Sequence, residues 1–362
     1  MSAPRPVLVT GASGFIGWHV VRELLRVGRS VRAFVRPSSD VRQLGELGVE
    51  FYVGDVLQPE SLVAPLRGVD AVVHLAGVMR AASEEAHRRV NVDGTMSLLD
   101  AVVPHARGLR RFVFLSSLAA AGPAHGREAL DETATPHPIG PYGRTKLEAE
   151  AAVGERRDRF PVTVFRPPLV YGPRDRSLLP YFQAVRAGLM VLPGGGEQPI
   201  SLIHAADLAA AVVRAIDRDH PSGSVFHIAD GPARRLRDLA EAVRLAQGTP
   251  ALSVAVSRRT MHAARKAVRF LLRWFPDMPA WIHPDSFELL LVPGWSCDDA
   301  LLRRTLDWAP SVTLLEGLAG TVEWYRDAGW LLRPWGGALN RRELRPSKAP
   351  PDSKRSSEGG KP

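Results

Sequence analysis

The sequence predicts an α/β protein built on a doubly wound parallel sheet, with a smaller, interleaved C-terminal helical region. Two observations predict this class. Short apolar runs alternate with amphipathic helical patterns over roughly the first half of the chain, and such alternation is typical of parallel sheets. Several of these runs are apolar at nearly every position, as expected for strands buried on both faces.

The first apolar run leads into a glycine turn. Val7–Thr10 is followed by the glycines of a Gly-x-x-Gly-x-x-Gly pattern and then by a helical pattern at 18–27. Unpaired backbone N–H groups at a helix start favour an anion, and glycines let a phosphate approach the backbone. The turn therefore predicts dinucleotide binding by Gly11, Ser13, Gly14, Phe15, Ile16 and Gly17, although such turns also occur without a ligand.

A second strand is expected at 30–36 and ends in Arg36. An acidic side chain at this place would bind the ribose hydroxyls of NAD. The guanidinium of Arg36 suits a 2′-phosphate instead, which favours NADP over NAD. A solvated surface arginine is the alternative interpretation.

The third and fourth strands are expected at 49–56 and 70–77, with helices at 59–66 and 83–103. Ligands of doubly wound sheets lie at the carboxyl ends of the strands. Cofactor-binding residues are therefore predicted at these ends, with Asn91 supporting them from the following helix: Asp55, Val56, Leu75, Ala76, Gly77 and Asn91. His74 lies among apolar neighbours and is interpreted as a core histidine.

A fifth strand at 111–117 ends in Ser116 and Ser117, and a helix opens at Pro141. Tyr142 and Lys146 are four residues apart and share one face of that helix. A lysine cation beside a tyrosine favours the phenolate, and a serine hydroxyl can stabilise charge on a substrate oxygen. Tyr-x-x-x-Lys by itself is common, so this hypothesis depends on the serine-ended strand before it.

A sixth strand, broken by Pro167 and Pro168, is expected at 162–173. The predicted dinucleotide-binding domain covers 1–173, with 201–231 returning to it through a late strand at 224–230. Segments 174–200 and 232–332 are assigned to a substrate-binding region. Residues 333–362 form a basic, polar tail that is expected to be disordered.

Composition limits the remaining possibilities. The 362 residues carry a net charge of +9 and a single cysteine, Cys297. An intrachain disulfide and a cysteine-based metal site are therefore excluded, no metal is predicted, and a cytoplasmic protein is expected. No run of about 18 apolar residues predicts a membrane span. We expect no nucleic acid partner, because part of the positive charge lies in the tail and part in a basic amphipathic helix.

That helix is expected at 258–275. Its apolar residues share one side of a helical wheel and its basic residues the other. The pattern is typical of peripheral contact with an anionic membrane, or of a helix packed on its own domain with a solvated basic face.

These motifs together resemble the extended short-chain dehydrogenase/reductase superfamily, whose core is a Rossmann fold, and most nearly its 3β-hydroxysteroid dehydrogenase and dihydroflavonol reductase branch. The resemblance covers Val7–Leu331 and includes Gly54-Asp55-Val56, Asn91-Val92-Asp93-Gly94-Thr95 and Tyr171-Gly172-Pro173. It implies Ser117, Tyr142 and Lys146 as the catalytic set, Tyr142 and Lys146 also touching the cofactor. Asp55 would lie near the adenine, and Pro167 and Pro168 beside the nicotinamide.

The resemblance implies an NAD(P)-dependent oxidoreductase that interconverts a hydroxyl and a ketone on an apolar, sterol-, isoprenoid- or flavonoid-like molecule. Leu118–Ala121 after Ser117 lacks the carboxylate of sugar dehydratases, and Leu169 replaces an asparagine of the epimerases. A nucleotide-sugar epimerase stays the alternative, since Arg174 and Arg176 could bind phosphates. A non-catalytic cofactor sensor is a third hypothesis. A homodimer formed through the helix of Tyr142 is also implied.

Overall fold

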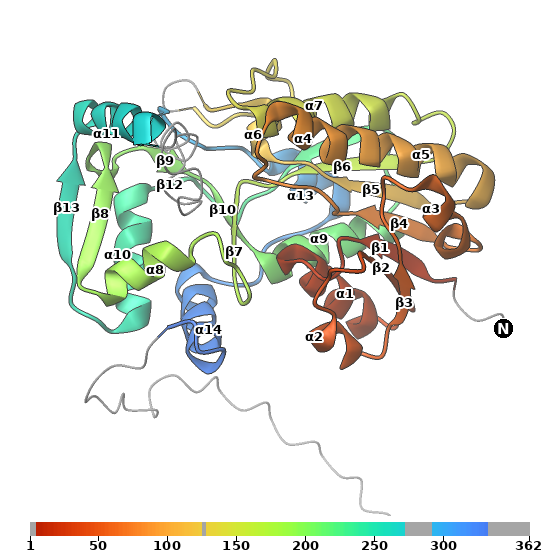
Figure 1. Ribbon diagram of the computed structural model, residues 1–362, viewed down its shortest axis with the longest axis horizontal. Coiled ribbons are helices and arrows are strands. Elements are labelled where there is room, and N and C mark those ends of the chain that lie inside the picture. Colours follow the sequence, from red (N-terminus) through yellow and green to blue (C-terminus); the bar gives the residue numbers. More distant parts are fainter. Residues whose placement is uncertain (1–4, 125–127, 272–291, 332–362) are drawn as a thin grey trace, which may run out of the picture. The chain divides into compact units, whose positions relative to one another are not determined.

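Seven parallel strands form the main sheet (Figure 1), in the order β11-β6-β5-β4-β1-β2-β3. Their bounds are β1 Val7–Thr10, β2 Val31–Val35, β3 Glu50–Val53, β4 Ala71–His74, β5 Arg111–Leu115, β6 Val162–Arg166 and β11 Ser224–His227. This computed structural model describes residues 5–124, 128–271 and 292–331, so the predicted tail at 333–362 lies outside the described residues.

Helices cover both faces of the sheet, which confirms the predicted doubly wound α/β class. One apolar core lies between the sheet and α1 (Phe15–Arg26), α2 (Arg42–Gly45), α9 (Ala205–Asp217) and α13 (Ala300–Leu306). The other lies beneath α3 (Pro59–Leu66), α5 (Gly94–His105) and α7 (Pro141–Gly154). The inner strands β1, β4, β5 and β6 are buried at every residue, as their near-continuous apolar sequences require, whereas the edge strand β3 is partly exposed.

The strand order reverses between β1 and β4. From β1 the chain adds β2 and β3 on one side, and β4, β5, β6 and β11 follow on the other. Crossover connections leave a crevice at the carboxyl ends of such neighbouring strands. The glycine turn after β1 and the loop after β4 meet at this point.

The helix predicted at 83–103 is interrupted. The structure has α4 at Glu84–Arg88, a π-helical turn at Arg89–Asp93 and then α5. Asn91 lies in the wide turn and its side chain bonds to backbone outside the helix. Such π-helical turns frequently accompany functional sites.

The sixth strand, predicted as one segment at 162–173, is divided between two sheets. β6 stays in the main sheet, whereas β7 (Leu169–Tyr171) pairs in parallel with β10 (Leu202–His204). Pro167 and Pro168 lack N–H groups and cannot continue a ladder of backbone hydrogen bonds, which explains the break between them.

The C-terminal region contains strands as well as helices, so its description as helical was incomplete. β8 (Leu189–Pro193) pairs in parallel with β13 (Leu252–Val256), and β9 (Pro199–Ile200) pairs with β12 (Arg234–Arg235). Helices α8 (Leu179–Arg186), α10 (Leu236–Gln247) and α14 (Leu314–Asp327) enclose a third core around Tyr171, Phe182 and Tyr325.

The basic helix is α11 (Arg258–Leu271), which lies above β8 and β13 in Figure 1. Met261 and Val268 are buried, whereas Lys266 and Phe270 are exposed. Residues 272–275 and the side chains of Arg265 and Arg269 lie outside the described residues. Among the described helices, none is long and apolar enough to cross a membrane.

Candidate active site

The glycine turn leaves no room for side chains. Gly11 has a φ of +69°, and a Cβ there would lie 2.8 Å from the Ala76 nitrogen. A Cβ on Gly17 would lie 2.1 Å from the Gly11 carbonyl oxygen. Gly14 is the N-cap of α1, and no described side chain caps this end. The first-turn N–H groups of α1, which include those of Ile16 and Gly17, are therefore available to an anion.

The loop after β4 is tied to α7 through Asn91. The Val78 N–H donates to Asn91 Oδ1 (2.8 Å), and Asn91 Nδ2 donates to the Val78 carbonyl (3.0 Å) and to Thr145 Oγ1 (3.1 Å). A Cβ on Gly77 would lie 3.1 Å from Asn91 Oδ1 and 3.4 Å from Lys146 Nζ. The structure therefore brings Gly77, Asn91 and Lys146 together.

His74 is a buried core histidine, as predicted. Its ring nitrogens are hydrogen-bonded to Thr10 Oγ1 (2.7 Å) and Thr95 Oγ1 (3.0 Å). Burial lowers its pKa to about 3, with a smaller contribution from the charge of Lys146. A neutral imidazole thus links β1, β4 and α5 beneath the crevice.

Ser117 and Tyr142 meet at the carboxyl edge of the sheet. Ser117 is the N-cap of α6 (Leu118–Ala121), and its Oγ accepts a hydrogen bond from the Ala119 N–H (3.1 Å). Its side chain also lies close enough to the phenol of Tyr142, in the first turn of α7, to lower the pKa of that phenol. Ser116 is buried, and its hydroxyl has no hydrogen-bond partner in the described part of the chain. The geometry therefore favours Ser117 over Ser116 as the serine that acts with Tyr142.

Burial governs the protonation of the Tyr142 phenol. It raises the pKa of Tyr142 to about 12, and the nearby hydroxyl of Ser117 acts in the opposite direction. We expected the Lys146 cation to lower this pKa. Instead, Lys146 Nζ donates to the Leu115 carbonyl (2.8 Å) and lies 4.7 Å from the centroid of the Phe114 ring. Burial lowers the pKa of Lys146 to about 8, while Glu150 raises it.

An ion pair between α7 and β6, one helical turn after Lys146, was not predicted. Arg166 at the end of β6 donates to Glu150 in α7, with a shortest nitrogen–oxygen distance of 2.6 Å. Both side chains are buried. Glu150 is four residues after Lys146 on the same helix face, and that spacing was the available signal. His87 was also missed: its ring centroid lies 6.4 Å from that of Tyr142.

The remaining predicted residues surround these groups. Pro167 is buried, and its carbonyl accepts a hydrogen bond from the Leu118 N–H (2.8 Å); Pro168 follows it. Asp55 Oδ1 accepts a hydrogen bond from the Leu57 N–H (3.0 Å), and Val56 packs against Gly94. Leu75 is partly buried after β4. Arg36 is exposed after β2, and its side chain forms no ion pair within the described ranges.

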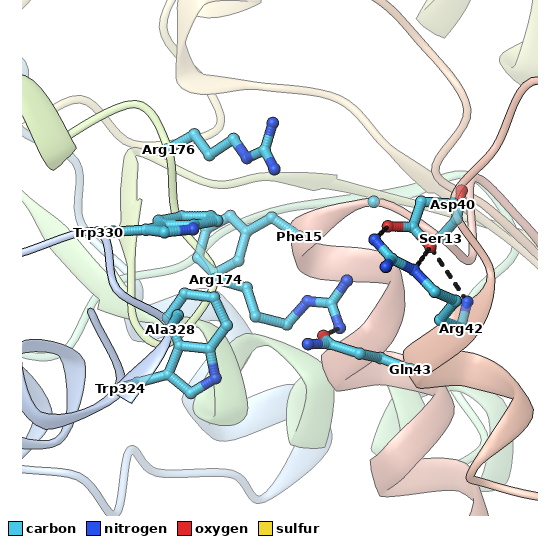
Figure 2. Close-up of a pocket in the computed structure, with 11 residues that line it drawn as sticks. Ser13, Phe15, Asp40, Arg42, Gln43, Arg174, Arg176, Trp324, Ala328 and Trp330 are labelled. Carbon is cyan, nitrogen blue, oxygen red and sulfur yellow. Dashed lines mark hydrogen bonds and ion pairs between the residues drawn. The ribbon is translucent and has the colours of Figure 1, made fainter. Parts of the chain in front are cut away.

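A pocket of about 530 Å³ opens beside the glycine turn (Figure 2). It lies between the glycine turn, the segment after β2, the segment after β7 and the end of α14. Its lining residues are Ser13, Gly14, Phe15, Asp40, Arg42, Gln43, Arg174, Arg176, Trp324, Ala328 and Trp330. Arg36, Ser117, Tyr142 and Lys146 are not among them.

The geometry fits a dinucleotide. The crowded glycines and the uncapped start of α1 suit a pyrophosphate, and Leu75–Gly77 continues the same edge toward Lys146. Ser117 and Tyr142 lie further along this edge, which suits proton transfer to or from a substrate oxygen.

Curated relatives include reductases. The chain is 30% identical over 329 residues to the 2-alkyl-3-oxoalkanoate reductase of Stenotrophomonas maltophilia, covering 86% of this chain and 97% of that protein. It is 30% identical over 344 residues to the ceramide reductase of Caulobacter vibrioides, covering 90% and 96% of the two chains.

Solved structures share the fold. MoeE5 in complex with UDP-glucuronic acid and NAD superposes with a TM-score of 0.70 at 28% identity, covering 89% of this chain and 99% of that one. Residues 7–229 match the NAD dependent epimerase/dehydratase family. These matches, together with the reductases among the relatives, show that the chain is an oxidoreductase belonging to the NAD dependent epimerase/dehydratase family, within the extended short-chain dehydrogenase/reductase superfamily.

Proposed function

We propose that the protein is an NADP-preferring oxidoreductase that interconverts a hydroxyl and a ketone on an apolar small molecule. The observation that carries this proposal is the contact between Ser117 and Tyr142 at the carboxyl edge of the sheet, with buried Lys146 on the same face of α7. A nicotinamide dinucleotide, when bound, supplies or accepts the hydride.

The chain's own residues would handle the proton. With a pKa of about 12, Tyr142 carries its proton at neutral pH and can donate it to a ketone oxygen during reduction. Ser117 accepts from the Ala119 N–H, and with substrate bound it would donate its own proton to the same substrate oxygen. Lys146 would hold the ribose beside Gly77, and its positive charge would favour the phenolate that forms.

The substrate class rests on two observations. Leu118, which follows Ser117, belongs to a small apolar cluster with Leu130, Trp295 and Cys297. The names of two relatives describe reduction of alkyl-chain substrates, a 2-alkyl-3-oxoalkanoate and a ceramide. Both support an apolar ketone or hydroxyl compound over a sugar.

The test is a turnover screen of sterol, isoprenoid, flavonoid, alkyl-chain ketone and UDP-sugar panels with NADPH and NADH, and with the oxidised cofactors for alcohols. We expect net cofactor oxidation with an apolar ketone and faster turnover with NADPH. Absence of net redox turnover on every apolar panel, with conversion of a UDP-sugar, would contradict the proposal.

The second candidate is a nucleotide-sugar epimerase, which the similarity to UDP-sugar-bound MoeE5 favours. Two features weigh against it. Leu169 lies where epimerases carry an asparagine, and Arg174 and Arg176 line the pocket beside Ser13, apart from Ser117 and Tyr142. An epimerase would retain its cofactor and show no net redox change.

A further inference from the structure

The pocket in Figure 2 has an unbalanced charge. Three arginines line it (Arg42, Arg174 and Arg176), against one carboxylate, that of Asp40. Asp40 is already paired with Arg42 at 2.7 Å. Within the described ranges no carboxylate forms an ion pair with Arg174 or Arg176. An anion entering the pocket would therefore meet two guanidinium groups that are not held in an ion pair, with the charge of Asp40 acting on Arg174 from a distance.

The backbone of Arg174 is strained, and its side chain is held by neighbouring residues. Its φ is 77°, a left-handed conformation that side chains rarely adopt. Its guanidinium lies 5.0 Å from the centroid of the Trp18 ring and bonds to the amide oxygen of Gln43. Burial lowers the pKa of Arg174; the charge of Asp40 acts against this, and the charge of Arg176 acts in the same direction as burial. Residues with strained backbone cluster at ligand sites. A bound anion would stabilise the charge of Arg174 against its burial and against the charge of Arg176.

The position of the pocket indicates which anion. Its wall includes Ser13 and Gly14 of the glycine turn and Asp40, Arg42 and Gln43 after β2. In this fold the adenosine ribose lies between these two segments, and a 2′-phosphate is accommodated by a nearby arginine. Figure 2 shows the guanidinium of Arg174 directed past Phe15 toward Gln43, on the same side as Ser13. Arg36 does not line this pocket.

We propose that this pocket binds the 2′-phosphate of NADP, with Arg174 as its main ligand and Arg42 and Ser13 beside it. The inference rests on the proposed function, because it names the group that decides between NADP and NAD. Planar guanidinium groups bind phosphates bidentately. Of the two arginines outside ion pairs, Arg174 is assigned the main role because it is held against Trp18 and Gln43, on the side of Ser13. An arginine that follows β7 would thus select the cofactor bound at β1 and β2.

The experiment is calorimetric binding of 2′,5′-ADP, 5′-AMP, NADP and NAD to the full-length protein and to Arg174→Gln. Arg22→Gln is the matched control, because Arg22 also lies over the Trp18 ring (4.6 Å) but does not line the pocket. Arg36→Gln tests the position that the sequence singles out. Thermal unfolding checks that each variant is folded, and Arg174→Lys, which keeps the charge without the fork, replaces Arg174→Gln if that variant is not.

We expect Arg174→Gln to weaken 2′,5′-ADP and NADP binding by about 10- to 100-fold. The affinities for 5′-AMP and NAD should stay unchanged, and Arg22→Gln should resemble the parent protein. Unchanged NADP affinity in Arg174→Gln overturns the inference, whatever Arg36→Gln does. Equal wild-type affinity for NADP and NAD also overturns it, while dinucleotide binding stands. Binding of neither dinucleotide overturns the proposed function as well.

Discussion

Tyr142 is the residue on which the chemistry depends, and its surroundings favour the neutral phenol. Burial raises its pKa to about 12, and the nearby hydroxyl of Ser117 lowers it by less. A neutral phenol suits proton donation to a ketone and disfavours proton removal from an alcohol. The site as it stands is therefore better prepared for reduction than for oxidation at neutral pH.

His74 makes the folded state sensitive to acid. Its pKa is about 3 in the folded protein, against 6.5 ordinarily, so the unfolded chain binds a proton first as the pH falls. The free energy of unfolding should therefore decrease between about pH 6.5 and pH 3. Urea denaturation of the parent protein and of His74→Gln from pH 7.5 to 4.5 measures this term. The stability advantage of the parent should shrink on acidification, and parallel curves would show that His74 does not titrate as described.

At the residue scale, short sequence patterns predicted the candidate catalytic side chains. A strand ending in Ser116 and Ser117 and a helical spacing of four singled out Tyr142 and Lys146, and the family resemblance implied Ser117 as the serine of the set. The environment of each side chain was beyond the sequence. That Lys146 donates to Leu115, and that Arg166 pairs with Glu150, depends on how α7 packs against β5 and β6.

At the scale of elements, the buried Glu150–Arg166 pair fixes α7 against β6. Removing one partner leaves a buried charge uncompensated, which costs about 3–5 kcal/mol. We expect Glu150→Leu and Arg166→Met each to lower the free energy of unfolding by this order. The double variant should be more stable than the sum of the two losses implies. A double-mutant cycle by urea denaturation measures the coupling, and strictly additive losses would contradict it.

The glycine turn depends on close contact between β1 and α1. A Cβ on Gly17 would overlap the Gly11 carbonyl oxygen at 2.1 Å, so Gly17→Ala must displace the turn. We expect a lower melting temperature and weaker NADP binding. Gly320→Ala is the control, because Gly320 also lies inside a helix and has open space around it. Equal effects of the two substitutions would mean that the tight contact is unimportant.

Strand positions were predictable wherever apolar runs were long enough to be buried on both faces. The divided sixth strand, the π-helical turn at Asn91 and the β8–β13 pair were not predicted. Each depends on a partner distant in sequence: β7 on β10, Asn91 on Thr145, and Leu189 on Leu252. β13 is mostly exposed and has no buried face. An alternation of buried and exposed residues, by which a half-buried strand is found, is therefore missing.

At the scale of the whole molecule, we propose that α11 brings the protein to anionic membranes. Met261 and Val268 are buried, so the outward side of the described helix is basic, with Phe270 59% exposed. Binding should therefore be mainly electrostatic and should weaken with salt. We also propose a homodimer through α7, which the molar mass in solution would test.

Co-sedimentation with phosphatidylserine vesicles measures the membrane contact. Replacing Arg258, Arg259 and Lys266 by Gln should abolish most binding, at about 1 kcal/mol per charge. The control replaces Arg67, Arg89 and Arg107, three exposed arginines on other elements, and should bind as the parent does. Equal loss of binding in both triple variants would mean that net charge, and not the basic side of α11, determines vesicle binding.

In the proposed function, Tyr142 transfers the proton while the chain binds a nicotinamide dinucleotide. Single-turnover oxidation of bound NADPH by a responsive ketone, in the parent protein and in Tyr142→Phe, tests it most directly. We predict an unchanged NADPH dissociation constant and a rate about 10²- to 10⁴-fold lower in Tyr142→Phe. An unchanged rate would contradict the role assigned to Tyr142, and with it this account of the site.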